Sequence, residues 1–213
     1  MRLAVFASGG GSNFQAILDA IKRGELQAEP VLCLSNSNQA GALKRAEVHH
    51  IPTVVLNPSS YDSVDLYTSQ LLETLDTYKV DFIALAGYLR KIPAPVVTAF
   101  KGRITNIHPS LLPAFGGKGM YGKRVHQAVL DYGVRWTGVT IHLVDEEYDS
   151  GPIILQEPVP VLPNDTVETL AARVLKVEHK LYPQALQLFA ENRIELCGRK
   201  VIINTQNHAY PDS

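Results

Sequence analysis

Short, continuously apolar segments alternate along this chain with segments whose apolar residues have helical spacing. A continuous apolar run of strand length is typical of a strand buried on both faces, as in parallel sheets covered by helices. In the first half, the strand-like segments are 3–7, 31–34, 53–56 and 82–86, and the helical ones are 14–21, 42–48, 66–75 and 96–100. The sequence therefore predicts an α/β fold with a mostly parallel sheet and helices on both faces.

The second half of the chain is less regular, which indicates a modified end of the sheet. Strand-like segments at 104–107, 139–143 and 153–161 accompany a helical segment at 125–130 and a glycine-rich loop at 116–122. Asp165 and Glu168 resemble a capping box that starts a long helix. We expect this helix to pack on the sheet through an apolar stripe that includes Leu170, Val174, Val177, Leu181 and Leu188.

The pattern of the last 20 or so residues predicts a small hairpin outside the main sheet. Segments 194–196 and 201–203 flank Gly198 and are typical of a closing hairpin, and the residues after Asn204 are a polar tail. With 213 residues, of which 46% are hydrophobic and 19% charged, the chain is ordinary for one globular domain. We therefore expect one main domain over residues 1–189, followed by a hairpin and tail over 190–213.

Composition excludes several classes of protein. The 20 basic and 21 acidic residues give a net charge of −1, which argues against nucleic acid or an anionic membrane as a partner. The apolar runs are far shorter than the roughly 20 residues of a membrane helix. Cys33 and Cys197 are too few for a disulfide framework, and Met1 leads directly into an apolar strand, so we expect a cytoplasmic protein.

The first loop, Ser8-Gly9-Gly10-Gly11-Ser12, follows a strand and precedes a helix. Consecutive glycines let the backbone approach a ligand, and we expect Ser12 and Gln15 to cap a helix whose free amides suit a phosphate. The dinucleotide fingerprint requires glycine where Phe14 stands, and the Gly-Lys-Ser/Thr of a P-loop is absent from the sequence. A tight turn without a ligand is the alternative.

A second group of polar residues, Asn106 and His108, lies where the strand 104–107 leaves the sheet. Strand alternation places both on one face, and the carboxyl ends of parallel strands hold the ligand crevice. An imidazole that exchanges protons and an amide that donates to an oxyanion together suit carbonyl chemistry. The alternative is that His108 only ends a strand.

The third group is an acidic turn, Asp145-Glu146-Glu147-Tyr148-Asp149, between two apolar strands. We expect Asp149 to raise the pKa of His108 and prepare it as a general acid. A solvated turn is the alternative, and a metal site is disfavoured because the sequence has no His/Cys ligand spacing. His49 and His50 are adjacent and are expected to be exposed at a helix end.

Together these segments resemble one family, the folate-dependent phosphoribosylglycinamide formyltransferases of purine synthesis. The resemblance runs from about residue 2 to about residue 189 and rests on Ser8–Asn13, Leu85–Arg90, Asn106–Pro113 and Asp149–Pro152. The N-x-H-P-S-L-L-P segment marks folate-dependent formyltransferases broadly, and the S-G-x-G-S-N loop narrows the match to this branch. The family implies a Rossmann-like catalytic domain over 1–189, with a phosphate-binding N-terminal half and a folate-binding, catalytic C-terminal half.

The resemblance also implies roles for particular residues. Gly11, Ser12 and Asn13 would hold the ribonucleotide phosphate, and Glu178 the ribose hydroxyls. The folate-binding set would be Leu89, Arg90, Lys91, Ile92, Asn106, Asp145, Glu146, Glu147, Tyr148 and Asp149. The co-substrate would be 10-formyltetrahydrofolate, with no metal, and the partners would be these small molecules, without nucleic acid or membrane, in a monomer or homodimer.

The mechanism that the family implies is direct formyl transfer. The glycinamide amine attacks the formyl carbon, Asn106 and a protonated His108 donate to the developing oxyanion, and Asp149 keeps the imidazolium available and relays protons. The alternatives are a formyltetrahydrofolate deformylase, in which water attacks, and a nucleotide-binding module without catalysis. Methionyl-tRNA formyltransferase is disfavoured because it requires a tRNA-binding domain and a basic surface.

The chain departs from the family pattern at two places. Val64 stands where some members carry a basic residue against the folate tail, and the alternatives are that Arg90, Lys91 or no residue substitutes for it. The loop 114–122 is longer and richer in glycine than the family's shortest loop. We predict that it is a flexible lid, whose Lys118 or the nearby Lys123 or Arg124 meets anionic groups of the substrates.

Overall fold

The computed structural model describes residues 1–204, so the predicted polar tail lies largely outside the described residues. Seven strands of the described chain form one sheet in the order β3-β2-β1-β4-β5-β6-β7. These strands are β1 (Arg2–Phe6), β2 (Glu29–Ser35), β3 (Thr53–Val55), β4 (Phe82–Leu85), β5 (Ile104–His108), β6 (Trp136–Leu143) and β7 (Ile153–Pro160). The first five in sequence pair in parallel.

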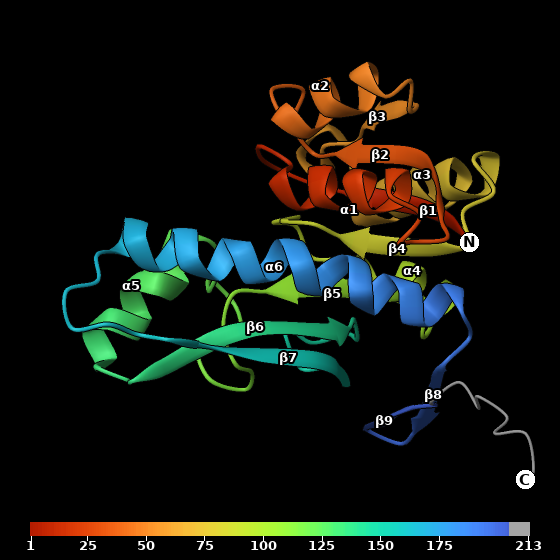
Figure 1. Ribbon diagram of the computed structural model, residues 1–213. Helices are drawn as coiled ribbons and strands as arrows, with labels where there is room; N and C mark the ends of the chain where they lie inside the picture. The colour runs from red at the N-terminus through yellow and green to blue at the C-terminus, as the bar shows by residue number, and fades with distance from the viewer. Residues whose placement is uncertain (205–213) are drawn as a thin grey trace, which may run out of the picture.

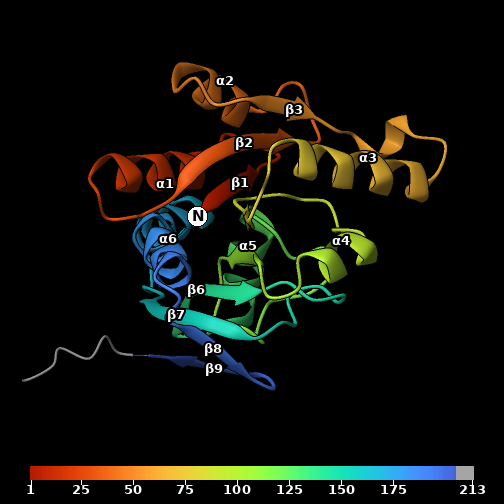
Figure 2. The ribbon, with the colours of Figure 1, turned by 90° about the vertical axis from the view of Figure 1, so that its right-hand side faces the viewer.

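Helices cover both faces of the sheet, as predicted (Figures 1 and 2). They are α1 (Ser12–Lys22), α2 (Gly41–Val48), α3 (Val64–Thr77), α4 (Ala94–Ala99), α5 (Lys123–Tyr132) and α6 (Val167–Ala190), with a short 3₁₀ turn, η1 (Pro58–Ser60). The two faces are built by strand alternation in β1. Leu3 and Val5 belong to the core that includes residues of α1, α2, α5 and α6, whereas Ala4 and Phe6 belong to the core with α3 and α4.

The modified end of the sheet consists of two antiparallel strands. β6 runs antiparallel to β5, with Asn106 opposite His142 and His108 opposite Thr140, and β7 runs antiparallel to β6. The predicted hairpin is also present, as β8 (Ile194–Cys197) and β9 (Lys200–Ile203), below β7 in Figure 1. The antiparallel end matters for the site because it brings β6 side chains next to the carboxyl end of β5.

The long helix α6 begins one residue later than the predicted capping box implies. Thr166 is the N-cap, and its side chain and that of Thr169 bond reciprocally to each other's backbone amides. The prediction for Asp165 and Glu168 was therefore wrong. The Asp165 carboxylate instead pairs with Arg173 at 2.7 Å and accepts from the Leu162 amide, because it lies on the loop side of the first turn.

Helix α6 is fixed to the sheet at a buried tyrosine. The Tyr182 hydroxyl lies 3.2 Å from the Leu85 carbonyl oxygen, at the end of β4, and 3.1 Å from the Thr105 carbonyl oxygen, near the start of β5. Glu178 is one turn earlier on the same helix and so is held near the end of β4 and the adjacent part of β5. Among residues 1–204, no helix is long and apolar enough to cross a membrane.

Candidate active site

A cavity of about 450 Å³ opens at the carboxyl ends of β4 and β5. Asn106 and His108 both line it, as strand alternation predicts, and the acidic loop between β6 and β7 forms another wall. Asn13 and Glu178 line the same cavity from α1 and α6. One cavity therefore joins the second and third of the groups that the sequence singles out with Asn13 and Glu178, whereas Ser12 of the glycine turn lines a separate groove between α1 and α6.

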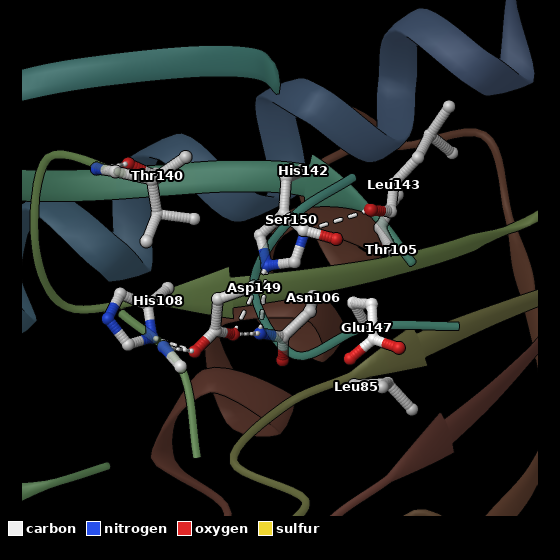
Figure 3. Close-up of polar contacts among 12 residues, drawn as sticks. Leu85, Thr105, Asn106, His108, Thr140, His142, Leu143, Glu147, Asp149 and Ser150 are labelled. Atoms are coloured by element: carbon white, nitrogen blue, oxygen red, sulfur yellow. Dashed lines mark hydrogen bonds and ion pairs between the residues drawn. The ribbon is translucent and has the colours of Figure 1, made fainter. Parts of the chain in front are cut away.

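Asp149 lies at the centre of the polar cluster in this cavity (Figure 3). Its Oδ2 is 3.6 Å from His108 Nδ1 and accepts from the Gly117 amide at 2.8 Å. Its Oδ1 is 3.4 Å from Asn106 Nδ2 and 3.6 Å from His142 Nε2. The backbone of Asp149 has φ +53°, a left-handed conformation that a non-glycine residue adopts rarely. The surrounding turn therefore holds Asp149 in one particular backbone conformation.

His142 is a member of this cluster that the sequence reasoning missed. Its Nδ1 lies 2.8 Å from the Leu143 carbonyl oxygen, which can only accept, so Nδ1 carries the proton. Its Nε2 then accepts from Asn106 Nδ2 at 3.1 Å. A signal existed in the sequence, since His142 lies within a predicted strand, but only the antiparallel pairing places it opposite Asn106.

His108 is 3% exposed, and burial lowers its pKa below the ordinary value. Asp149 and the Phe115 carbonyl, which lies 2.9 Å from Nε2, act in the opposite direction but are outweighed. The expected upward effect of Asp149 on the pKa of His108 is therefore present, but burial outweighs it and the net shift is downward. Desolvation of the imidazolium is the larger effect because strands and loops enclose the ring.

The Asp149 carboxylate is charged. Burial works against its ionisation, but the neighbouring His142 and His108 rings and the hydrogen bond from the Gly117 amide together lower its pKa. A Cβ placed on Gly116 would lie 2.5 Å from a Leu112 side-chain carbon and 3.3 Å from the Asp149 Cβ. The glycine-rich loop thus approaches Asp149 more closely than a larger residue would allow.

The glycine turn after β1 ends at Gly11, which is the N-cap of α1 with φ +72°. A Cβ on Gly11 would lie 2.7 Å from the Ala42 Cβ, so α2 packs directly on the turn. Among residues 1–204, no side chain caps α1 here, so the prediction for Ser12 and Gln15 was wrong. Ser12 is already in the first helical turn, and the Gln15 amide group bonds to Asp19 and Arg45. The first amides of α1 remain available to an anion.

Asn13 and Glu178 meet across the cavity although they are 165 positions apart. Asn13 Nδ2 donates to Glu178 Oε2 at 2.6 Å, and the two residues are 8% and 9% exposed. Burial raises the pKa of Glu178, against the opposing effect of Asn13. Asn13 Oδ1 is buried without a hydrogen-bond partner in the described part of the chain, so its capacity to accept a hydrogen bond is unused there.

Arg45 is a second residue that the sequence reasoning missed. From α2, its Nε donates to the Gly10 carbonyl at 2.8 Å and its Nη1 to Gln15 Oε1 at 3.0 Å. With Ser12 it lines a groove between α1 and α6. The sequence carried no signal for it, because a single arginine on an amphipathic helix is an ordinary surface residue.

The predicted folate-binding residues are mostly at the cavity. Leu89, Arg90, Lys91 and Ile92 all line it, as do Asp145, Glu147 and Tyr148 of the acidic loop. Glu146 does not line the cavity and is exposed. Asp145 Oδ1 accepts from the Glu147 amide and the Ser150 hydroxyl, so this side chain also shapes the loop.

The predicted substitutes for a basic residue at position 64 lie in different surroundings. Val64 is 71% exposed and does not line the cavity, whereas Arg90 and Lys91 do, with Lys91 Nζ 5.6 Å from the centre of the Tyr148 ring. Lys123 pairs with Glu168 at 2.9 Å, outside the residues that line the cavity. Lys118 and Arg124 line the cavity. The flexibility of loop 114–122 stays a prediction.

His49 and His50 end α2 and are exposed, as predicted. Within the described range 1–204, no cluster of three or more His, Cys, Asp or Glu side chains is arranged to hold a metal ion.

The comparisons with known proteins agree with this site. A sequence profile described as formyl transferase matches residues 1–186. A phosphoribosylglycinamide formyltransferase of Bacillus subtilis is 41% identical over 186 residues, covering 87% of this chain and 93% of that protein. A crystal structure of glycinamide ribonucleotide transformylase 1 from Symbiobacterium toebii superimposes with a TM-score of 0.90 at 43% identity, covering 95% of this chain and 93% of that one.

A chloroplastic phosphoribosylglycinamide formyltransferase of Vigna unguiculata is 48% identical over 193 residues, which is 91% of this chain. The chain spans 62% of the length of that plant protein. The chain belongs to the formyl transferase family, in its phosphoribosylglycinamide formyltransferase branch. Membership implies a folate-derived formyl donor and small-molecule substrates.

Proposed function

We propose that the protein transfers the formyl group of 10-formyltetrahydrofolate to the amine of 5-phosphoribosylglycinamide, in the synthesis of purine nucleotides. The observation that carries this proposal is the shared cavity. Asp149, with His108 and Asn106 around it, and the Asn13–Glu178 pair beside the glycine turn line the same space. A folate and a ribonucleotide bound at these two ends would bring amine and formyl carbon together, which removes much of the entropic cost of their encounter.

The ribonucleotide end supplies charge and hydroxyl recognition. The phosphate would accept from the free first amides of α1 after Gly11, and Arg45 would add the full positive charge that backbone dipoles lack. The ribose hydroxyls would bind Glu178 and the open acceptor Asn13 Oδ1. The folate would lie against Leu89–Ile92 and the acidic loop 145–149.

The amine forms a bond to the formyl carbon while the carbonyl electron pair moves to oxygen, and the bond to the folate nitrogen then breaks. Asn106 would donate to the oxyanion through Nδ2, exchanging its long 3.4 Å contact with Asp149 for the substrate oxygen. One proton leaves the amine and one reaches the folate nitrogen. A neutral His108 can carry that proton, because Asp149 and the oxyanion both favour the imidazolium once the substrates are bound.

This catalytic machinery lies within residues 1–189, which we propose as the catalytic domain. The cytoplasmic location and a monomeric or homodimeric state stay predictions of the sequence.

The test is the absorbance change as the purified protein converts 10-formyltetrahydrofolate to tetrahydrofolate, with and without the ribonucleotide, beside a His108→Ala variant. Turnover that requires the ribonucleotide and is lost in the variant is expected. Turnover without it would identify a deformylase instead. Absence of turnover in both conditions would favour a nucleotide-binding module.

A further inference from the structure

Three loops at the carboxyl end of the sheet are joined by one serine hydroxyl. β2, β1 and β4 are neighbours, and Asn36, Ser8 and Leu89 lie in the loops that follow them. The Leu89 amide donates to Ser8 Oγ at 2.8 Å, and Ser8 Oγ donates to Asn36 Oδ1 at 2.5 Å. The side chain of Ser8 therefore connects segments that are 28 and 81 positions away from it.

The direction of these bonds is determined by their chemistry. A backbone amide can only donate, so Ser8 Oγ must accept from Leu89, and its own hydrogen then goes to the Asn36 carbonyl oxygen. The Ser8 amide adds a parallel connection, since it donates to the Gly87 carbonyl at 3.0 Å. The Asn36 side chain thus orients the Ser8 hydroxyl. The hydroxyl in turn accepts from the Leu89 amide, two residues after Gly87.

The two connected segments are the two binding regions of the proposed function. Ser8 directly precedes the glycine turn, and Leu89 begins the segment Leu89–Ile92 that lines the cavity. Ser8 itself is not among the residues that line the cavity or the groove between α1 and α6. Its hydroxyl therefore acts on substrates only through the backbone that it holds.

We propose that Ser8 is a positioning residue. Its hydroxyl, oriented by Asn36, holds the segment Leu89–Ile92 against the loop that carries the glycine turn. This inference rests on the proposed function, because it assigns the folate to Leu89–Ile92. The loop after β4 has no regular structure between Leu85 and Ala94, so a lost anchor at Leu89 leaves the segment free to shift. A shift of that wall weakens folate binding first, since the glycine turn keeps its own contacts with α2.

The experiment compares Ser8→Ala with Ser8→Thr, which keeps a hydroxyl, and with Ser37→Ala as a matched control. Ser37 lies in the loop after β2, and its hydroxyl accepts from the Gln39 amide, away from the folate segment. In Ser8→Ala we expect the KM for the formyl donor to rise roughly 3- to 10-fold, as for loss of one hydrogen bond, with the ribonucleotide KM changed less than twofold. Ser8→Thr restores part of the loss, and Ser37→Ala leaves both KM values unchanged.

A second variant tests whether Asn36 and Ser8 act together. As a single variant, Asn36→Ala is expected to raise the KM for the formyl donor. In a Ser8→Ala background it should raise this KM little further, because both residues act through the same hydrogen bond to the Leu89 amide. Full additivity, an unchanged donor KM in a folded Ser8→Ala protein, or an equal rise in both KM values would overturn the proposal.

Calorimetric titration with tetrahydrofolate separates this inference from the proposed reaction, because it needs no turnover. The Kd for tetrahydrofolate is expected to rise in Ser8→Ala by the same factor as the donor KM. A wild-type chain that binds tetrahydrofolate without transferring formyl would reject the proposed reaction and still permit the Ser8 comparison. A wild-type chain that does not bind it would reject both.

Discussion

The two ends of the cavity are built in different ways. At the proposed ribonucleotide end, the glycine turn and the first amides of α1 adjoin the cavity at Asn13 and are consecutive in sequence, and α6 adds one buried acid, Glu178. At the catalytic end, Asn106 and His108 come from β5, His142 from β6 and Asp149 from the loop before β7. The first end depends on local backbone geometry, whereas the second depends on the pairing of distant strands. Variants should therefore affect the two ends separately.

The largest effect is expected at the catalytic end. Asp149→Asn removes the charge that favours the His108 imidazolium, so kcat should fall by roughly 10²- to 10³-fold, as for loss of positioned acid–base catalysis. The ribonucleotide KM should stay within about twofold of wild type. Steady-state kinetics measures both values.

Glu147→Gln is the matched control for Asp149→Asn, because it makes the same chemical change in the same loop at a residue that lines the cavity outside the cluster. Its kcat should stay near wild type. An equal loss of kcat in the two variants would mean that loop charge, and not the Asp149 cluster, carries the effect.

Glu178→Gln should weaken ribonucleotide binding and leave folate binding unchanged. Loss of a charged hydrogen-bond acceptor for the ribose costs about 1.5–3 kcal/mol, which corresponds to a rise of roughly 10- to 100-fold in the ribonucleotide KM. Calorimetric titration with tetrahydrofolate should give a Kd near wild type. A matching loss of folate affinity would show that the two ends are not independent.

A smaller effect on the same end is expected from Arg45→Met, which keeps the length of the side chain and removes its charge. The ribonucleotide KM should rise roughly 3- to 10-fold, by loss of an ion-assisted contact to phosphate, and the difference from wild type should shrink at high salt. Lys44→Met, an exposed neighbour on α2, is the control and should change the KM little. If both variants raise the ribonucleotide KM equally, the cause is the total positive charge of α2 and not a contact made by Arg45.

The pKa shift of Glu178 gives a prediction for stability. Burial raises this pKa above the ordinary value of 4.5, so the folded protein binds the proton more tightly than the unfolded chain does. The stabilising contribution is full below pH 4.5 and is lost as the pH rises through the folded pKa. Urea denaturation of Glu178→Gln should therefore show a gain in the free energy of unfolding over wild type that is larger at pH 8 than at pH 5. Glu47→Gln, the same substitution at an exposed site, is the control in the same measurement.

The smallest effect concerns the start of α6, far along the helix from Glu178. Thr166→Ala removes the N-cap and should lower the free energy of unfolding by about 1 kcal/mol, with both KM values unchanged. Thr166→Ser keeps the hydroxyl and should restore most of the loss in urea denaturation. A change in the ribonucleotide KM would show that the cap also positions Glu178.

Much of the fold was predictable because its signals are local. Continuous apolar runs such as 82–86 identify strands buried on both faces, and the apolar stripe from Leu170 to Leu188 identifies a packed helix. The predicted capping box at Asp165 was wrong by one position, since Thr166 and Asp165 are both good N-caps and only the packed first turn selects between them. Which of two adjacent residues becomes the N-cap depends on the contacts of a single helical turn, and the sequence pattern does not show these contacts.

Residue patterns alone predict the parallel sheet, the glycine turn and the candidate residues Asn106, His108 and Asp149, because strand alternation and motif spacing act over short distances. Only the tertiary structure placed His142 opposite Asn106, joined Asn13 to Glu178 and put Arg45 on the glycine turn. It also set the direction of the His108 pKa shift, since the balance between burial and Asp149 depends on how closely the strands enclose the ring. Pairing register and desolvation are properties of the packed chain, and no local pattern of residues encodes them.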